Sequence, residues 1–523
     1  MTTAAPSARF FRLFELEPTR FDADFLLALG AAMAQDRMER VPLNIPSGYV
    51  YLGQFLAHDL THQRGGTDLP SVQQSTADAL VQLNEPTLEL DSVYGPNAAA
   101  LAPDNPALAL ARGKFRLGAA GDGRRERPGC DLPRDPQTLE ALIADFRNDE
   151  NLLIGQLHLQ FLKLHNFFFD RLQAQTPGAS VKELFAAARQ QTILHYQMVI
   201  LYEWLAKVLD DDVWRHLIRD DRQDCGALWD TAKHPAPDMP IEFSFGAMRF
   251  GHSMVLPSYN ITSTQVMKIE EAFLLTGRGG FKGLRRLPPT HVVDWTLFFG
   301  DPLLNPHGPL MNFAMRISDA VVLKVPPHVA TGDGRHFHQL AKRNLARSLT
   351  AMVPSGQQVV ALLRERHGEL CRLIALDDQY LAATANCLRA DNNPVLGMTL
   401  AESGQTAQGE IEVPLWYYVL AEAFAHNGDS VDGNYRNWGR LGKVGSLIIA
   451  EVVRTLTRLG SISVYRALPA CYDALTRSGC VTRADGNRGG SNKAVSNKVV
   501  SDKGEGERIR FSTMLDLLTA VHT

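Results

Sequence analysis

The sequence lacks the features that exported and membrane-embedded proteins carry. None of its six cysteines belongs to a CxxC pair, and their scattered positions predict free thiols in a reducing compartment rather than a disulfide framework. No apolar run approaches the ~18–20 residues that span a bilayer. The first residues, MTTAAPSARFFRLFELEP, have neither a basic start nor a continuous apolar stretch, so no secretory signal is predicted. We expect a soluble, cytoplasmic protein, with export without a leader left open.

A strong charge imbalance is also missing. The 53 Lys and Arg residues nearly balance 57 Asp and Glu residues, which gives a net charge of −4 over 523 residues. Neither a nucleic acid nor an anionic membrane is therefore expected as a partner. The apolar fraction of 45% and the charged fraction of 21% are those of an ordinary globular protein with a large core.

Alternating strand patterns are few, and no repeat of fixed period occurs. Helical periodicity instead dominates, so a single large, mainly α domain with little β structure is predicted. We divide the chain into a leader with one helix (1–40), the main domain (41–482), and a polar, flexible segment with a short C-terminal helix (483–523). The Gly-, Pro- and Asp-rich stretch 64–140 is expected to line a site in part. Helical patterns cover 49–63, 136–172, 181–209, 241–257, 290–301, 313–324, 337–352, 355–375, 410–426 and 444–459.

We expect the helix predicted over residues 49–63 to lie at the centre of the fold and to carry part of the functional site. Gln54 and His58 stand four residues apart, so both side chains leave the same helical face, whereas Asp59 points about 100° away. This pair suits a small polar pocket that moves protons, and a buried, hydrogen-bonded histidine is the alternative interpretation. The sequence from His58 to His62 also imitates the zinc-hydrolase motif HExxH, but an aspartate replaces its glutamate general base.

Two further islands hold the residue types of a redox pocket: DFRNDEN (145–151) and MRFGHSMV (248–255). A haem iron needs one neutral imidazole as an axial ligand. On the opposite side, a base must move the peroxide proton, and a cation must stabilise developing charge. His252, His58 and Arg147 could fill these three roles. Taken singly, however, such a histidine is more often part of a core and such an arginine part of a surface ion pair.

Taken together, the three islands resemble the peroxidase–cyclooxygenase superfamily, the animal-type haem peroxidases, and within it the bacterial members. The similarity extends from about residue 40 to 460 and includes QLHLQFLKLHN (156–166) and RLGKVGSLIIAEVV (440–453). The resemblance implies a mostly α-helical domain with haem b between core helices. It also implies a haem peroxidase that reduces hydrogen peroxide or an organic hydroperoxide and oxidises a small organic or halide donor.

The resemblance also implies roles for individual residues. His58 matches the distal histidine, Gln54 the distal-pocket glutamine, Arg147 the catalytic arginine and His252 the proximal iron ligand. Arg249 matches a residue that reaches toward a haem propionate. In the family, an asparagine near a Leu-Pro-Gly turn accepts the second ring N–H of the proximal histidine. The stretch MVPSGQ (352–357) places Gln357 there.

Three departures from the family pattern bear on how haem and calcium are held. Ala57 stands where better-known members have an ester-forming carboxylate, and Asn151 stands where some have a sulfonium-forming methionine. Glu150 retains the second carboxylate, so at most one covalent haem link is expected.

Family members also bind Ca²⁺ beside the distal histidine. The matching residues here are Asp59, Glu85, Thr87, Glu89 and Asp91, although a shorter Asp is usual in place of Glu89. An acidic surface loop is the alternative.

Other functions on the same fold stay open. Haem dioxygenases of the fatty-acid or cyclooxygenase kind carry a radical-forming tyrosine three residues before the proximal histidine, where this chain has Arg249. Tyr259 lies seven residues beyond His252 and is a poor substitute. The sequence thus favours a peroxidase, with a specialised biosynthetic oxidase as a further alternative. The presence of both His58 and Arg147 argues against a mere haem binder, which would need neither.

Overall fold

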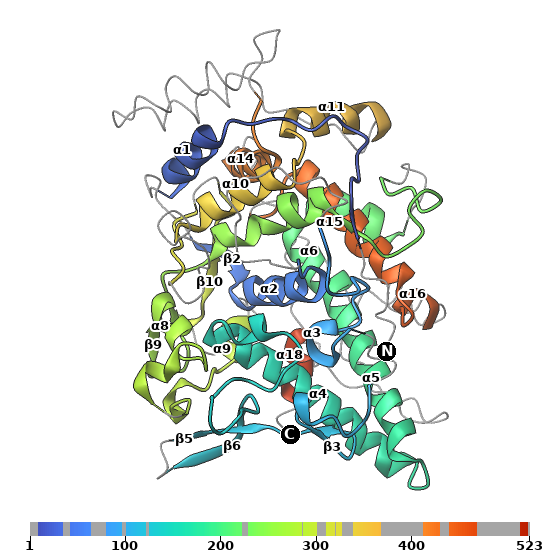
Figure 1. Ribbon diagram of the computed structural model, residues 1–523, viewed down its shortest axis with the longest axis vertical. Coiled ribbons are helices and arrows are strands. Elements are labelled where there is room, and N and C mark those ends of the chain that lie inside the picture. The colour runs from blue at the N-terminus through green and yellow to red at the C-terminus, as the bar shows by residue number, and fades with distance from the viewer. Residues whose placement is uncertain are drawn as a thin grey trace, which may run out of the picture.

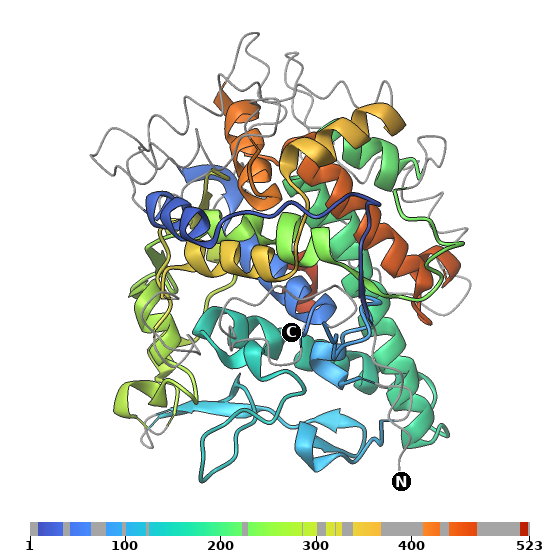
Figure 2. The same cartoon turned by 45° about the horizontal axis from the view of Figure 1, so that its top comes forward.

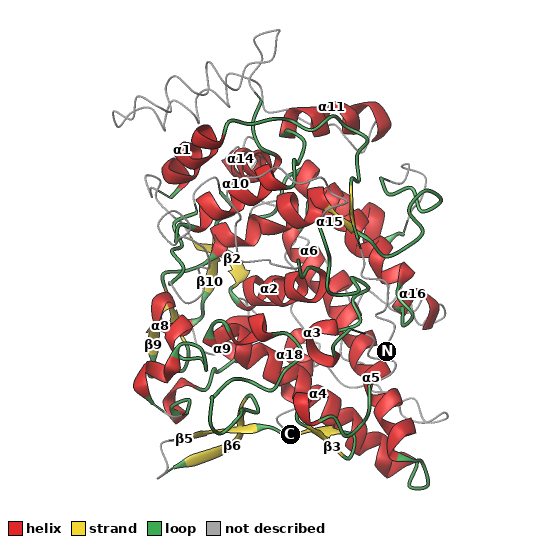
Figure 3. Cartoon of the chain, viewed as in Figure 1, coloured by secondary structure: helices red, strands yellow, loops and turns green. Residues whose placement is uncertain are grey.

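The structure is a computed structural model in which helices form most of the described chain (Figure 3). The described residues are 9–34, 42–63, 80–96, 101–121, 125–221, 228–284, 286–300, 310–318, 321–326, 338–367, 412–428, 439–467 and 513–520. The predicted flexible segment 483–507 lies outside them. No helix in these ranges is long and apolar enough to cross a membrane.

The α-helices are α1 (Ala23–Met33), α2 (Gly48–Leu60), α3 (Asp91–Tyr94), α4 (Leu152–Gln175), α5 (Val181–Val199), α6 (Leu205–Val208), α7 (Asp211–Trp214), α8 (Ile269–Leu274), α9 (Thr296–Phe299), α10 (Leu340–Thr350), α11 (Gly356–His367), α14 (Leu415–Gly428), α15 (Lys443–Leu459), α16 (Val464–Ala467) and α18 (Met514–Ala520). Shorter 3₁₀ segments are η3 (Pro106–Leu108), η4 (Phe146–Asp149), η8 (Ala247–Met254), η9 (Gly280–Gly283) and η10 (Pro289–His291). The π segments are η5 (Ile200–Trp204), η6 (Arg215–Arg219) and η7 (Glu242–Gly246).

Within the described ranges, the strands form five two-stranded pairs between and around the helices (Figure 3). A parallel pair joins β1 (Phe10–Phe11) to β7 (Met239–Pro240). The antiparallel pairs are β2 (Pro42–Pro46) with β10 (Phe313–Met315), β3 (Leu110–Ala111) with β4 (Lys114–Phe115), β5 (Gly118–Gly121) with β6 (Glu126–Asp131), and β8 (Ser258–Asn260) with β9 (Val266–Lys268).

Helix α2 lies at the centre of the molecule, with other helices around it in both views (Figures 1 and 2). Its apolar side chains Leu52, Phe55, Leu56 and Leu60 are fully buried, as their helical spacing predicts. It packs against α4, α9, η5 and η8. A side chain at Gly53 would lie 3.0 Å from the Trp204 ring, so a glycine is needed for this close approach.

Helices α4 and α5 pack against each other, and α4 also packs against α2. Asn151 caps α4 because its side chain accepts a hydrogen bond from the Ile154 amide. A capping box of Ser180 and Glu183 begins α5. The Phe55 ring of α2 stacks on the Phe161 ring of α4, with 4.5 Å between the ring centroids, and this contact fixes α2 against α4.

The prediction of a mainly α chain with little β structure is confirmed, with three local corrections. Residues 313–315 form strand β10 instead of a helix, because they pair with β2. Helix α4 begins at Leu152 rather than near residue 136, because Asn151 caps it there. The segment that carries His252 is a π turn followed by 3₁₀ turns. The two meet at Gly246, which has a non-helical φ of −113° and ψ of −102°.

Candidate active site

Most of the predicted pocket residues surround one cavity of about 520 Å³ next to α2. Its walls come from α2, η4, η8, α8 and α10, with contributions from η5 and α6. Gln54, Ala57 and His58 line it from α2, Arg147 from η4, and His252 with Arg249 from η8. The volume lies within the ~300–1,000 Å³ of small-molecule and cofactor sites. Islands that lie about 100 residues apart in sequence therefore meet around one space.

His58 presents its Nε2 atom as the basic nitrogen. Its Nδ1 lies 2.8 Å from Asn148 Oδ1, so Nδ1–H donates to the amide oxygen and Nε2 keeps its lone pair. Asn148 Nδ2 in turn donates to Nδ1 of the buried His158 at 3.0 Å. Burial, and after it the Arg147 charge, lowers the pKa of His58 to about 4. The imidazole is therefore neutral, and able to accept a proton, at physiological pH.

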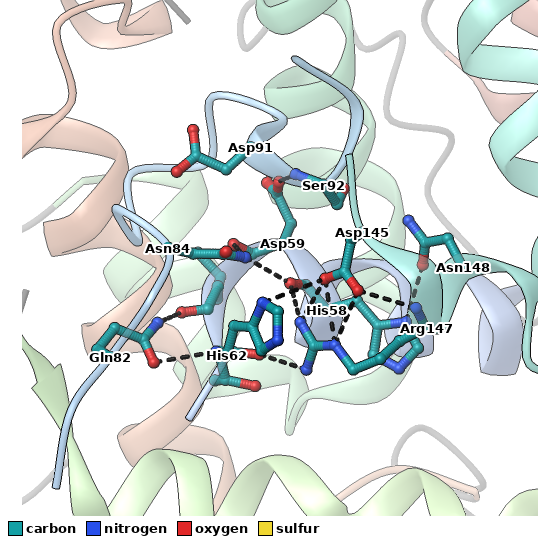
Figure 4. A network of polar contacts seen from close by, with 12 residues as sticks. His58, Asp59, His62, Gln82, Asn84, Asp91, Ser92, Asp145, Arg147 and Asn148 are labelled. Carbon is teal, nitrogen blue, oxygen red and sulfur yellow. Dashed lines mark hydrogen bonds and ion pairs between the residues drawn. The ribbon is translucent and has the colours of Figure 1, made fainter. Parts of the chain in front are cut away.

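Arg147 is clamped between Asp145 and the end of α2 (Figure 4). Asp145 accepts from Nε at 3.0 Å and from Nη2 at 2.5 Å. Nη1 donates to Thr61 O at 2.6 Å, and Nη2 to His58 O at 2.8 Å. These bonds use four of the five guanidinium N–H groups, which leaves one on Nη1 for a ligand in the cavity. Burial alone would raise the pKa of Asp145, but Arg147 outweighs it and holds that pKa below its usual value.

Gln54 is held in place by the two residues at the start of α4. Its Nε2 donates to Glu150 Oε1 at 3.1 Å, and its Oε1 accepts from Asn151 Nδ2 at 3.5 Å. Burial raises the pKa of Glu150, whereas the Arg343 and Arg147 charges lower it. Glu150 is the one carboxylate among the described residues that line the cavity. Its position beside Gln54 and Ala57 makes it part of the same wall as His58.

The residue bonded to His252 is Asn344 of α10, and the prediction of Gln357 is wrong. Asn344 Nδ2 lies 2.7 Å from His252 Nδ1. The Gln357 side chain instead accepts from the Val413 amide at 3.0 Å. Helix α10 ends before Gln357, and the chain turns at Met352, which has a φ of +53°. Gln357 therefore lies in the next helix, α11, and no described residue of α11 lines the cavity.

Arg249 and Asn344 together determine the ring nitrogen that His252 presents. Arg249 Nη1 donates to Asn344 Oδ1 at 3.0 Å, so the amide turns its NH₂ group toward His252. In this arrangement Nδ1 accepts and Nε2 carries the hydrogen. Ligation of a metal through Nε2 needs the opposite tautomer, in which Nδ1–H donates to the amide oxygen. Metal ligation therefore requires Asn344 to rotate its amide and Arg249 to give up this contact.

The wall that α10 forms is cationic. Arg343 and Arg347 line the cavity together with Arg249. Burial, followed by the neighbouring guanidinium groups, lowers the pKa of Arg347 well below its usual value. Arg347 Nε has no hydrogen-bond partner among the described residues. An uncompensated buried cation is costly, so this wall favours an anionic group in the cavity.

The mouth of the cavity has an exposed aromatic ring and a further arginine. Phe146 is 44% exposed, which is unusual for a large apolar side chain. The Arg278 guanidinium lies 4.1 Å from the centroid of its ring. Both side chains line the cavity. The entrance thus combines a flat apolar surface with positive charge.

The residues predicted to bind calcium lie near one another but enter separate hydrogen bonds. Burial, followed by the charges of Asp59, Glu85 and Glu89, raises the pKa of Asp91 well above its usual value. The carboxylate of Asp59 accepts from the Leu90 and Ser92 amides at 3.3 and 3.1 Å. Asp91 accepts from the Glu85 amide at 2.8 Å, and the Glu85 side chain is exposed. Among the described residues, no group of three or more His, Cys, Asp or Glu side chains is arranged to hold a metal ion.

The main reason is the position of Glu89, which corrects its predicted role. Its carboxylate lies 3.3 Å from Arg189 Nη2 and also accepts from the Ser461 hydroxyl and the Ile462 amide. The buried Thr87 lies on the same side, next to Gly460. Glu89 thus faces α5 and the end of α15, whereas the Leu90 and Ser92 amides of the same loop contact Asp59.

Sequence reasoning missed Asn148, Asn344, Arg343 and Arg347. Arg343, Asn344 and Arg347 stand at i, i+1 and i+4 on the amphipathic helix α10 and so share one polar face, which was the available signal. For Asn148, the signal was weaker: a single asparagine inside an already noted island. Its contact with His58 spans 90 residues and has no local signature.

Comparisons with known proteins show a family match for part of the chain and a shared fold. Residues 90–278 match the family model described as animal haem peroxidase. Peroxidase A from Dictyostelium discoideum has a TM-score of 0.54 at 15% identity, over 90% of this chain and 90% of that chain. A fatty acid alpha-dioxygenase from Oryza sativa has a TM-score of 0.55 at 14% identity, over 86% of this chain and 75% of that chain. At these identities, the structural likeness shows the fold alone. Residues 90–278 therefore match the animal haem peroxidase family, and the chain shares its fold with a peroxidase and a fatty acid alpha-dioxygenase.

Proposed function

We propose that this protein is a haem-dependent peroxidase that reduces hydrogen peroxide or an organic hydroperoxide and oxidises a small donor. The observation that carries the proposal is the pair of imidazoles, His58 and His252, on different walls of one cavity. His58 offers a basic Nε2 above the space, and His252 offers a neutral ring beside a cationic wall.

The residues around the cavity fit haem b. Burial and the Arg249 and Arg343 charges lower the pKa of His252 to about 3, so the ring is available as a neutral ligand. The two propionates of haem would supply the anions that the Arg347 and Arg249 wall lacks. Met248, Phe250 and Val255 would provide apolar contact for the ring system. Bound haem would supply the redox chemistry.

Three side chains would act on the peroxide. His58 Nε2 takes the proton of the attacking peroxide oxygen and returns it to the leaving oxygen. The remaining Nη1 hydrogen of Arg147 stabilises the negative charge that develops as the O–O bond breaks. Gln54, held between Glu150 and Asn151, orients water or peroxide but carries no proton. Asn344 takes the positioning role that the sequence assigned to Gln357, and Arg249 pairs with a propionate.

The proposal includes one covalent haem link, through Glu150, formed in part under oxidising turnover. Glu150 faces the cavity, and Ala57 and Asn151 remove the other linking groups. We do not include a calcium site, because Glu89 pairs with Arg189 and the Asp59 carboxylate accepts backbone amides.

A dioxygenase or a specialised oxidase is the competing proposal, and the fold shared with a fatty acid alpha-dioxygenase motivates it. Arg249 stands where a radical-forming tyrosine would be expected, so a peroxidase is favoured. Steady-state assays with peroxide across phenols, halides and unsaturated fatty acids distinguish the two. Oxygen uptake with a fatty acid in the absence of a donor would favour the dioxygenase.

The deciding experiment measures haem binding and the reaction with peroxide separately. The purified protein should show a Soret band near ~400 nm after haem loading. His252→Ala should lose haem or bind it only with added imidazole. His58→Ala should keep haem and react ~10²–10⁴-fold more slowly with peroxide in stopped-flow mixing. Gln54→Ala serves as a matched control on the same wall and should have a milder effect. A wild-type rate in His58→Ala would contradict the proposed mechanism.

A further inference from the structure

Two tyrosines of α2, Tyr49 and Tyr51, line the cavity at the opposite end of the helix from His58. Neither takes part in the proposed reaction with peroxide. Both are buried, but their hydroxyl groups meet different partners. A buried phenol can lose an electron readily only if its proton has somewhere to go, because the oxidised ring is a strong acid. The partner of each hydroxyl therefore decides what that tyrosine can do.

The Tyr49 hydroxyl donates a hydrogen bond to the carboxylate of Glu203 in η5. The other oxygen of Glu203 accepts from the Met514 amide of α18 at 2.6 Å. Burial raises the pKa of Glu203 to about 7, although the Tyr49 and Met514 bonds and the Lys207 charge oppose the shift. At neutral pH this carboxylate is therefore ready to accept a proton.

Tyr51 has no such acceptor among the described residues. Its ring meets Tyr259 edge-on at 5.6 Å, and burial followed by Tyr259 raises the pKa of Tyr51 well above its usual value. The Tyr259 hydroxyl accepts from the Leu256 amide at 2.9 Å. Tyr51 is thus a cavity tyrosine of the same helix without a carboxylate, which makes it a matched control.

The surroundings of the Tyr49 ring also favour coupled loss of a proton and an electron. The Lys207 ammonium lies 5.0 Å from the ring centroid, and a cation there disfavours a positively charged ring. Electron loss is then favoured only if the proton leaves at the same time. Trp204 donates to the Tyr49 carbonyl at 2.9 Å, and both side chains line the cavity, so the Tyr49 ring lies next to the space where the oxidant forms.

We propose that Tyr49 is a redox-active tyrosine that loses one electron to the oxidant generated in the cavity while its phenolic proton passes to Glu203. The step converts Tyr49–OH and Glu203–COO⁻ into a neutral Tyr49–O• and Glu203–COOH and releases one electron. Hydrogen peroxide is the final electron acceptor: it takes up two electrons and two protons to give two water molecules. One peroxide therefore serves two such one-electron oxidations. The inference rests on the proposed function, because that reaction supplies the oxidant.

The test uses electron paramagnetic resonance on the haem-loaded full chain, frozen shortly after mixing with one equivalent of hydrogen peroxide. Wild type should show an organic radical signal that narrows when the protein contains ring-deuterated tyrosine. Tyr49→Phe should lose this signal, and Tyr51→Phe should keep it. Glu203→Gln keeps a hydrogen-bond acceptor but not the base, so radical formation should slow about 10²-fold or more.

A variant-free measurement covers the case in which Tyr49→Phe does not fold. A spin trap added to wild type during the reaction should be found on the peptide that contains Tyr49 by mass spectrometry. A signal that persists in Tyr49→Phe, or a trap on another residue, overturns the inference. So does wild-type protein that consumes peroxide normally without a tyrosyl signal, and this result leaves the proposed function intact. Protein that does not bind haem or consume peroxide overturns both.

Discussion

At the scale of single residues, Asn148 decides the chemistry of the distal histidine. Its amide oxygen accepts His58 Nδ1–H, and its amide nitrogen donates to His158. Both histidines are held neutral, because burial lowers the pKa of His58 to about 4 and that of His158 to about 3. In the proposed reaction, Asn148 would therefore be a positioning residue, because its contact leaves Nε2 of His58 free to act as the base.

Replacement of Asn148 tests this role. Asn148→Leu should keep haem but slow the reaction with peroxide about 10–100-fold, because either tautomer of His58 becomes accessible. Asn148→Asp keeps an acceptor and should restore part of the rate. Its buried carboxylate should also raise the pKa of His58 and move the acid limb of the pH–rate profile upward. Equal rates in the Leu variant and wild type would assign Asn148 a purely structural role.

The pH dependence of the same reaction follows from the lowered pKa of His58. The basic form exists above the folded-state pKa of about 4, so the rate should be lost as the pH falls through about 4. After burial, the Arg147 charge is the next cause of the lowered pKa. Arg147→Gln should therefore move the acid limb to higher pH and also slow the reaction at pH 7. Stopped-flow rates between pH 3 and 8 provide the measurement, and an unshifted limb would contradict this electrostatic coupling.

At the scale of elements, a buried carboxylate joins the N-terminal segment to the segment that carries His252. Glu242 of η7 accepts from the Leu13 amide at 2.9 Å and from the Phe14 amide at 3.4 Å. The adjacent strands β1 and β7 pair in parallel, and α1 packs against α10. Residues 9–33 therefore support the proximal side of the cavity. Burial raises the pKa of Glu242 to about 7.

This raised pKa predicts a loss of stability with rising pH. Between the usual pKa of 4.5 and about 7, the folded state binds a proton that the unfolded state does not. The free energy of unfolding should fall over this window, by on the order of 3 kcal/mol from this group. Glu242→Gln should remove this slope. Urea unfolding of both proteins at pH 5 and pH 8 measures the difference, and parallel pH profiles would contradict the prediction.

At the scale of the whole molecule, the cavity is where distant parts of the chain meet. Its walls come from α2, η4, η8 and α10, and the α10 wall includes a guanidinium whose Nε has no partner among the described residues. A cofactor that satisfies these groups stabilises the folded chain by mass action. Stability of the entire domain is thus coupled to haem binding.

Haem titration in thermal unfolding experiments tests this coupling. At a free haem concentration about 100-fold above Kd, wild type should gain about 2.7 kcal/mol of stability. His252→Ala should gain much less at the same concentration, because it lacks the axial bond. Gln357→Ala, which changes a side chain away from the cavity, is the control and should gain as much as wild type. The same gain in His252→Ala would mean that the stabilisation does not come from this site.

The sequence by itself determined the features that depend on local spacing. Helical periodicity gives α2, α4, α5, α10, α14 and α15, and the i, i+4 spacing of Gln54 and His58 places both on the cavity wall. The three islands also sufficed to predict the family and its mainly α fold. Each of these inferences uses residues within a few turns of one another, where backbone geometry alone sets the relative positions.

Only the tertiary structure decided which partners those residues meet. Asn344, not Gln357, bonds to His252 across 92 positions, because the turn at Met352 carries the following helix away. Glu89 pairs with Arg189 across 100 positions, so it does not join Asp59. Side chains such as Asn and Glu have many chemically equivalent partners, and the docking of distant helices selects one of them. Local periodicity places a side chain on a face, whereas packing decides what that face touches.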